Sequence, residues 1–214
     1  MKIQINKKPY GWLSADAPLS CNYITPAIIK VLKKISRQFG SILDIGSGNG
    51  FLCSQLSLLG YDVVGIEPDK HGFEISKETY PDVEFYNLGL DSEPSILIEN
   101  RGDLFDVVVS TEVIEHLYSP SQLPQFAGKV LKEGGYFIIS TPYHGYLKNL
   151  ILALMDKWDF HHHPLLDGGH IKFWSRRTIA RLLDENGFEM IGFLGVGRFP
   201  YLWKSMILIA RKVS

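Results

Sequence analysis

The most informative segment of this sequence is Ile42-Leu43-Asp44-Ile45-Gly46-Ser47-Gly48-Asn49-Gly50-Phe51. A short apolar run that stops at glycines predicts a buried strand, a tight turn and the start of a helix. Glycine lets a backbone turn sharply and approach a ligand, and the first N–H groups of a helix have no partner within the helix. The segment therefore predicts a ligand-binding turn at the carboxyl end of a strand.

Strand-like and helix-like segments alternate on both sides of this turn. Thr25-Pro26 is typical of a helix start, and Gly40 of a helix end. Further helices are expected over residues 51–60, 69–80, 119–131 and 175–186, and further strands over 61–67, 83–86, 104–110, 136–140, 188–196 and 205–212. This order predicts an α/β fold with a doubly wound, mostly parallel sheet and helices on both faces. Ligands of such sheets bind beyond the carboxyl ends of the strands.

The length of 214 residues fits one domain, 1–214. We divide it into a lead-in (1–24), a cofactor-binding core (42–140), an insertion (142–174), and a C-terminal helix and hairpin (175–214). The insertion is much longer than a usual connection between a strand and a helix, and long connections in compact domains are often functional. We interpret it as a small cap over a substrate cleft. A purely structural insertion would have the same length and composition.

Composition limits the classes of function. There are 22 Lys+Arg and 23 Asp+Glu, a net charge of −1, which argues against a nucleic-acid-coating protein while remaining compatible with a local basic patch. Cys21 and Cys53 form no CxxC pair, which disfavours a disulfide framework or a cysteine zinc site. No signal peptide is visible, and the apolar runs are too short to span a bilayer. These features predict a cytoplasmic protein without a membrane span that acts on a small molecule.

The glycine spacing identifies a cofactor class. A nicotinamide or flavin fingerprint is G-x-G-x-x-G, whereas here glycines stand at 46, 48 and 50, with Asp44 two residues before the first. That acid would repel a pyrophosphate but suits an amino group. Glu67 ends the next strand about 20 residues later, where a carboxylate can accept both ribose hydroxyls. A ribose, a charged amino acid and no phosphate together describe S-adenosylmethionine.

Four stretches in order, ILDIGSGNGFL, VVGIEPD, FDVVVSTEVIEHL and LKEGGYFIISTP, resemble the motifs of class I S-adenosylmethionine-dependent methyltransferases. The resemblance covers residues 42–188 and points to the branch of ubiquinone-biosynthesis O-methyltransferases. It implies a seven-stranded Rossmann-like sheet whose last strand is antiparallel. It also implies cofactor contacts at Asp44 (amino group), Gly46, Ser47 and Gly48 (methionine portion), Glu67 (ribose), Pro68 and Asp69 (adenosine), Leu90 and Asp91 (adenine), and Thr111 (methionine). Residues 88–91 depart from the family's usual G-D-A-E wording, which leaves the adenine contacts less defined.

Glu112-Val113-Ile114-Glu115-His116 follows the fourth expected strand. On a helix, Glu112, Glu115 and His116 would share a face and could hold a divalent cation such as magnesium. The wording resembles two metal-assisted branches, the ubiquinone-biosynthesis enzymes that act on catechol-like rings and the small-RNA 3′-end 2′-O-methyltransferases. In the second branch a downstream histidine joins the metal, which makes His170 the candidate. Similar wording also occurs in methyltransferases without metal, where the acids cap a helix.

The expected chemistry is transfer of a methyl group to oxygen. A cation would lower the pKa of an acceptor hydroxyl, and His116, His162 or His170 could take its proton, with Glu115 beside them as a further candidate catalytic residue. The favoured acceptor is a phenol, quinol or sugar-like small molecule. The alternatives are methylation of RNA 3′ ends and a catalytically silent S-adenosylmethionine-binding module; nitrogen and carbon acceptors and the oligomeric state stay open.

Overall fold

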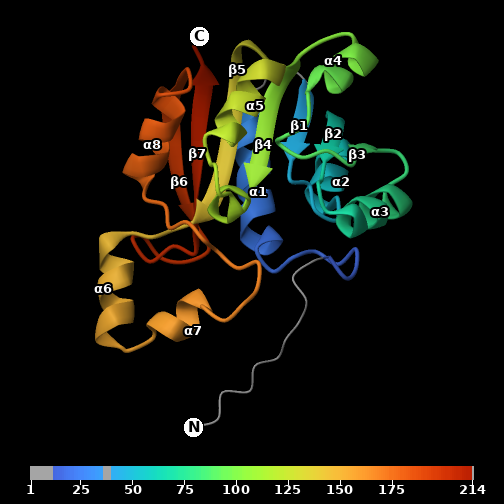
Figure 1. Ribbon diagram of the computed structural model, residues 1–214. Helices are drawn as coiled ribbons and strands as arrows, with labels where there is room; N and C mark the ends of the chain where they lie inside the picture. Colours follow the sequence, from blue (N-terminus) through green and yellow to red (C-terminus); the bar gives the residue numbers. More distant parts are fainter. Residues whose placement is uncertain (1–11, 36–39, 214) are drawn as a thin grey trace.

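A computed structural model describes residues 12–35 and 40–213. Its centre is a seven-stranded sheet in the order β3-β2-β1-β4-β5-β7-β6 (Figure 1). The strands are β1 (Ser41–Ile45), β2 (Asp62–Ile66), β3 (Glu84–Tyr86), β4 (Phe105–Thr111), β5 (Leu131–Pro142), β6 (Phe188–Val196) and β7 (Ser205–Lys212). β1 to β5 pair in parallel, and β7 is antiparallel to both β5 and β6. The expected α/β fold, with a mostly parallel sheet closed by a terminal hairpin, is confirmed.

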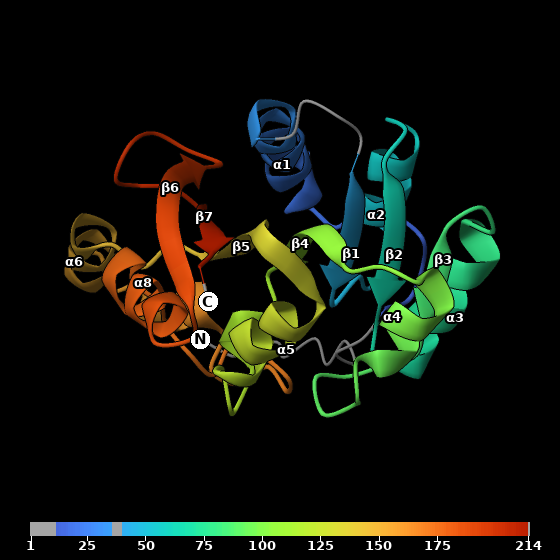
Figure 2. The ribbon, with the colours of Figure 1, turned by 90° about the horizontal axis from the view of Figure 1, so that it is seen from above.

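Helices cover both faces of the sheet, as Figure 2 shows from above. They are α1 (Cys21–Ile35), α2 (Phe51–Ser57), α3 (Lys70–Thr79), α4 (Ser95–Arg101), α5 (Gln122–Val130), α6 (Tyr146–Leu154), α7 (Trp158–His162) and α8 (Arg176–Asp184), with a single 3₁₀ turn η1 (Ile114–His116). Side chains of α1, α2 and α3 pack on one face of the sheet, and those of α4, α5 and α8 on the other. Every residue of β1 is buried because both faces of a parallel sheet are covered.

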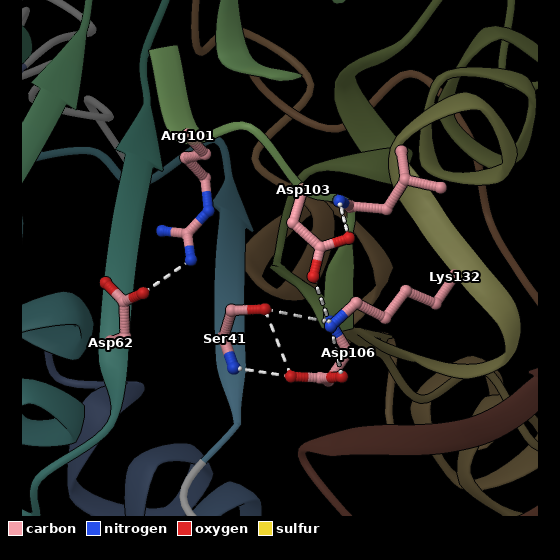
Figure 3. Close-up of polar contacts among 7 residues, drawn as sticks. Ser41, Asp62, Arg101, Asp103, Asp106 and Lys132 are labelled. Atoms are coloured by element: carbon pink, nitrogen blue, oxygen red, sulfur yellow. Dashed lines mark hydrogen bonds and ion pairs between the residues drawn. The ribbon is translucent and has the colours of Figure 1, made fainter. Parts of the chain in front are cut away.

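The amino ends of the parallel strands are tied together by satisfied polar contacts (Figure 3). The carboxylate of Asp106 accepts hydrogen bonds from the Ser41 N–H (2.8 Å) and from Lys132 Nζ (3.0 Å). Partial burial acts to raise the pKa of Asp106, but these bonds outweigh it and the pKa lies below its usual value. Arg101 and Asp62 form a further ion pair there. The polar groups at this end of the sheet therefore bind one another and hold neighbouring strands together.

Some predicted boundaries are wrong. The first helix begins at Cys21, not at Thr25, because the Ile24 N–H already bonds to the Ser20 carbonyl. Pro26 thus lies inside α1, where its missing N–H leaves one helical bond unformed. Residues 36–39, between Ile35 and the expected helix end at Gly40, lie outside the described residues. Helix α4 was not predicted.

Two segments near the expected site, the one after β4 and the insertion (142–174), have structures that the sequence did not define. Glu112 has a positive φ of 55°, so an α-helix does not follow β4 and only the turn η1 forms. The insertion contains two helices, α6 and α7, which lie beyond the carboxyl ends of the parallel strands (Figure 1). Within the described ranges, no helix combines the length and apolar character needed to cross a bilayer.

Candidate active site

A cavity of about 520 Å³ opens at the carboxyl ends of β1, β2 and β4. Its wall brings together segments that are far apart in the sequence. Among the predicted cofactor residues, the following line it: Asp44, Gly46, Ser47, Glu67, Pro68, Asp69, Leu90, Asp91 and Thr111. Gly48 does not line the cavity itself but binds one of the residues that do. Nine of the ten residues predicted to contact the cofactor therefore line one cavity.

The glycine turn is held against β2 by its backbone. The N–H groups of Gly46 and Ser47 both donate to the Ile66 carbonyl, at 2.9 and 3.0 Å. Gly46 has φ +76°, and a Cβ there would collide with the Val113 side chain. Glycine at 46 therefore serves two needs, the left-handed backbone and the close approach of the segment after β4. The Ser47 hydroxyl is buried and has no hydrogen-bond partner among the described residues.

Asp44 lies at the bottom of the cavity and is 1% exposed. Its Oδ2 accepts a bond from the Cys53 thiol (3.3 Å), whereas Oδ1 has no partner among the described residues. Burial raises the pKa of Asp44 from 3.8 to about 7. A buried carboxylate without a counter-charge is unfavourable, so the position suits a ligand that brings an ammonium group.

Glu67 is buried at the end of β2 and organises the turn around it. Its Oε2 accepts the Gly48 N–H (2.8 Å) and its Oε1 accepts the Asp69 N–H (2.9 Å). Each oxygen keeps a lone pair, so the carboxylate can still accept two hydroxyl groups. Asp69 in turn caps α3 by accepting the Gly72 N–H (2.8 Å). The geometry fits the ribose contact expected from the sequence.

The lead-in closes one side of the cavity. Trp12 lines it and packs against Gly48 and Gly72, where any Cβ would strike the indole. Asn49, which is 1% exposed, anchors the lead-in because its Nδ2 donates to the carbonyls of Ser14 (3.0 Å) and Asp16 (2.9 Å). Trp12 and the first turns of α1 thus form one wall of the cavity.

Glu112 is separated from the other expected metal ligands. Its carboxylate accepts hydrogen bonds from the hydroxyls of Ser140 (2.9 Å) and Ser205 (3.2 Å), on β5 and β7. Burial raises the pKa of Glu112 to about 7. The left-handed backbone turns this side chain toward the sheet, so Glu112 lines the cavity as a single acid instead of sharing a helix face with Glu115 and His116.

Glu115, His116 and His170 do come together. One ligand atom from each lies within 4.8 Å of the others, and His170 Nε2 is 4.0 Å from Glu115 Oε1. That oxygen is buried and has no hydrogen-bond partner among the described residues, while Oε2 accepts the Thr141 hydroxyl (3.0 Å). His116 Nδ1 lies 3.1 Å from the Gly168 carbonyl, which favours a proton on Nδ1 and a lone pair on Nε2. The three groups could hold a cation.

The insertion is tied to this cluster by its backbone. The N–H groups of Ile171 and Lys172 donate to the Glu115 carbonyl at 2.9 and 3.0 Å. His162, the remaining histidine predicted as a site residue, lies apart from the three, packed against His144 (ring centroids 5.4 Å apart). The structure thus separates the predicted histidines into two groups.

Several residues of the site were not predicted. Asn49 sits between two glycines, and an amide in a glycine turn is a signal that could have indicated an anchor. His144 precedes α6 and Lys148 lies within it. The signal in the sequence was a single lysine in an otherwise apolar helix. Ser20, Cys21 and Thr25 line the cavity only because α1 begins early.

Comparison with known proteins agrees with this geometry. A family model described as a methyltransferase domain matches residues 22–192. The chain belongs to this methyltransferase family. The match includes the glycine turn, Glu67 and the segment from Thr111 to His170, so most of the cavity wall lies within the matched region, whereas Trp12, Ser20 and Cys21 precede it.

Named relatives narrow the class. The methyltransferase is 26% identical over 163 residues to a ubiquinone biosynthesis O-methyltransferase of Bartonella quintana, covering 74% of this chain and 64% of that protein, less than two thirds of its length. It is 26% identical over 191 residues to the enzyme of that name from Aliivibrio fischeri, covering 86% and 76%.

A solved structure shares the fold. The magnesium protoporphyrin IX methyltransferase of Synechocystis, with bound SAH, superposes with a TM-score of 0.67 at 16% identity, covering 88% of this chain and 82% of the other. At that identity the likeness establishes the Rossmann-like methyltransferase fold. The family, the named relatives and the fold together make this protein an S-adenosylmethionine-dependent methyltransferase.

Proposed function

We propose that this methyltransferase moves the methyl group of S-adenosylmethionine to a hydroxyl oxygen of a small phenol, quinol or sugar-like acceptor, with the help of a divalent cation. The observation that carries the proposal is the cluster of Glu115, His116 and His170. His116 belongs to both the cluster and the cavity wall, so an acceptor oxygen bound by the cation would lie next to the cofactor.

The cofactor assignment rests on unsatisfied groups in the cavity. Asp44 Oδ1 would receive the ammonium of the methionine portion, and Glu67 would accept the ribose hydroxyls. Gly46, Ser47, Gly48 and Thr111 would surround the methionine, Pro68 and Asp69 the adenosine, and Leu90 and Asp91 the adenine. The buried, unpartnered carboxylate oxygen of Asp44 is the strongest support, because an isolated charge is costly to bury.

The reaction is an in-line displacement. The acceptor oxygen forms a bond to the methyl carbon, the carbon–sulfur bond breaks with its electron pair on sulfur, and the hydroxyl proton leaves. A bound cation would lower the pKa of that hydroxyl. Burial holds the pKa of His116 below its usual value and lowers that of His170 to about 4, so both imidazoles are neutral at pH 7 and can present a ring nitrogen to a cation. With a pKa of about 4, His170 is a weak base, which favours His116 over His170 as the proton acceptor.

The ligand set bears on the identity of the cation. The carboxylate of Glu112 is hydrogen-bonded to Ser140 and does not belong to the cluster, which leaves one carboxylate and two imidazoles. Imidazole nitrogens suit zinc and iron better than magnesium, which prefers oxygen ligands. Zinc and iron should therefore be compared with magnesium in any assay.

The decisive experiment follows transfer of labelled methyl to a panel of catechols, sugars and RNA oligonucleotides, before and after chelation and with each metal restored. We expect labelled catechol, loss of transfer on chelation, and loss in Glu115→Gln with unchanged S-adenosylmethionine affinity. Glu99→Gln, an exposed change on α4, is the matched control. Activity that survives both chelation and Glu115→Gln would refute the cation, and labelling of RNA alone would refute the small acceptor.

A further inference from the structure

Helix α6 has an inverted polarity. Lys148 is its one buried residue, only 6% exposed, whereas Tyr146 and Leu154 on the same helix are 83% and 78% exposed. A surface helix normally buries its apolar side and leaves its lysines in water. Helix α6 lies beyond the carboxyl ends of the parallel strands (Figure 1), and the charge of Lys148 acts on that of Glu112, which lines the cavity.

The ammonium of Lys148 forms no ion pair with a described residue, although the charge of Glu112 acts on it from farther away. Its Nζ donates to the Tyr143 carbonyl at 2.9 Å, and no carboxylate of the described residues lies within ion-pair distance of it. Burial, followed by the positive charge of Arg198, lowers the pKa of Lys148 to about 8, so the group is still mainly charged at pH 7. An ammonium has three donors, and a buried one is stable only when they are occupied.

The charge of Lys148 acts on three histidine rings, those of His144, His161 and His162, which pack on one another. His144 stacks on His162 with centroids 5.4 Å apart, and His161 meets His162 edge-on at 4.9 Å. Phe173 packs edge-on against both His144 and His162. The Nε2 atom of His162 is buried without a partner among the described residues. The cluster thus offers a cation and imidazole nitrogens in an aromatic setting, and no acid of its own.

The cluster adjoins the cofactor cavity. Glu112 lines the cavity, and its charge and that of Lys148 act on each other. His170, in the predicted cation site, also feels the charge of Lys148. A ligand held by Lys148 would therefore extend toward the place where the acceptor hydroxyl must lie.

We propose that Lys148, with His144, His161 and His162, binds an anionic group of the methyl acceptor, a carboxylate or a phosphate ester. The acceptor would carry this anion on the side away from the hydroxyl that is methylated. This inference rests on the proposed function only in naming the acceptor as the ligand, because the anion site itself is defined by Lys148 and the three rings.

Binding can be measured without catalysis. Protein saturated with S-adenosylhomocysteine is titrated calorimetrically with 3,4-dihydroxybenzoate, with its neutral counterpart 3,4-dihydroxybenzamide, and with phenyl phosphate. We expect the anionic probe that matches the site to bind roughly 10-fold or more tightly than the amide, as a charge-assisted hydrogen bond predicts. Preference for the benzoate identifies a carboxylate, and preference for phenyl phosphate identifies a phosphate ester.

Three substitutions distinguish binding at Lys148 from a general effect of positive charge. Lys148→Met should abolish the preference, Lys148→Arg should retain it, and Lys157→Met, an exposed change in the same insertion, should leave it unchanged. Thermal unfolding of Lys148→Met should show no loss of stability, whereas a merely structural lysine would leave a less stable protein when removed.

The proposal is overturned if neither anion binds more tightly than the amide to the unmodified protein, or if Lys148→Met keeps the preference. The first of these needs no variant, so it decides the matter even if Lys148→Met does not fold. Intact anion preference without methyl transfer to oxygen would refute the proposed function and leave the anion site standing.

Discussion

Replacing Asp44 with asparagine should change the stability of the cofactor-free protein in a pH-dependent way. Relative to the unmodified protein, the variant should be more favoured at pH 8 than at pH 5. Burial raises the pKa of Asp44 from 3.8 to about 7, which corresponds to about 4 kcal/mol that ionisation costs the folded state. Between about pH 4 and pH 7 the folded state keeps a proton that the unfolded chain has lost. The free energy of unfolding therefore falls as the pH rises through this window.

An asparagine at position 44 cannot ionise, so the variant lacks this loss. From pH 5 to pH 8 the unmodified protein should lose about 2–3 kcal/mol relative to Asp44→Asn, since roughly two pH units of the window are crossed at about 1.36 kcal/mol each. At pH 5 the variant should be the less stable protein by about 1–3 kcal/mol, because the new amide nitrogen faces the same unpartnered position as Oδ1.

The assay is urea unfolding of both proteins at pH 5 and pH 8, with the exposed Asp82→Asn as the matched control. Other buried acids titrate in the same range, but they are common to both proteins and cancel in the difference. S-adenosylmethionine should stabilise the unmodified protein at pH 8 and stabilise Asp44→Asn much less, because the ammonium loses its partner. A stability difference that does not change with pH would refute the reasoning.

Three further changes probe the same structure. Glu67→Gln should weaken S-adenosylmethionine binding roughly 10-fold or more by calorimetry, since an amide accepts fewer bonds and Oε1 and Oε2 already serve Asp69 and Gly48; unchanged affinity would contradict the ribose assignment. Asn49→Ala should speed proteolytic cleavage within residues 12–20, because Asn49 donates both bonds that anchor this segment; an unchanged rate would mean that other contacts hold it. Leu43→Ala, in the fully buried β1, should lower the free energy of unfolding by about 2–5 kcal/mol in urea.

The parallel strands could be predicted because each one is a local signal. β1, with its five buried residues, and the terminal hairpin, predicted at the observed boundaries of β6 and β7, are apolar runs bounded by glycines or polar residues. The same locality explains why nearly all the residues expected to contact the cofactor line one cavity. A turn that follows a parallel strand must lie at the carboxyl edge of the sheet, whatever the rest of the chain does.

The segment after β4 could not be predicted, because its shape is decided by distant residues. Helix spacing placed Glu112 beside Glu115, yet hydroxyls of Ser140 and Ser205, 28 and 93 residues away, bind the Glu112 carboxylate. Those contacts and the positive φ of Glu112 replace a helix by one 3₁₀ turn. The same limit applies to Lys148, whose burial depends on how α6 docks.

The buried acids at the two ends of the sheet differ in how completely they are hydrogen-bonded. At the amino ends, Asp106 is partly buried and has several hydrogen-bond partners and a lowered pKa. At the carboxyl ends, Asp44 and Glu115 are almost fully buried, and each keeps one oxygen without a partner among the described residues and has a raised pKa. Burial acts to raise the pKa of all three acids, but only Asp106 has partners that outweigh it. An ammonium at Asp44 and a cation at Glu115 would supply the positive charges that the chain itself omits.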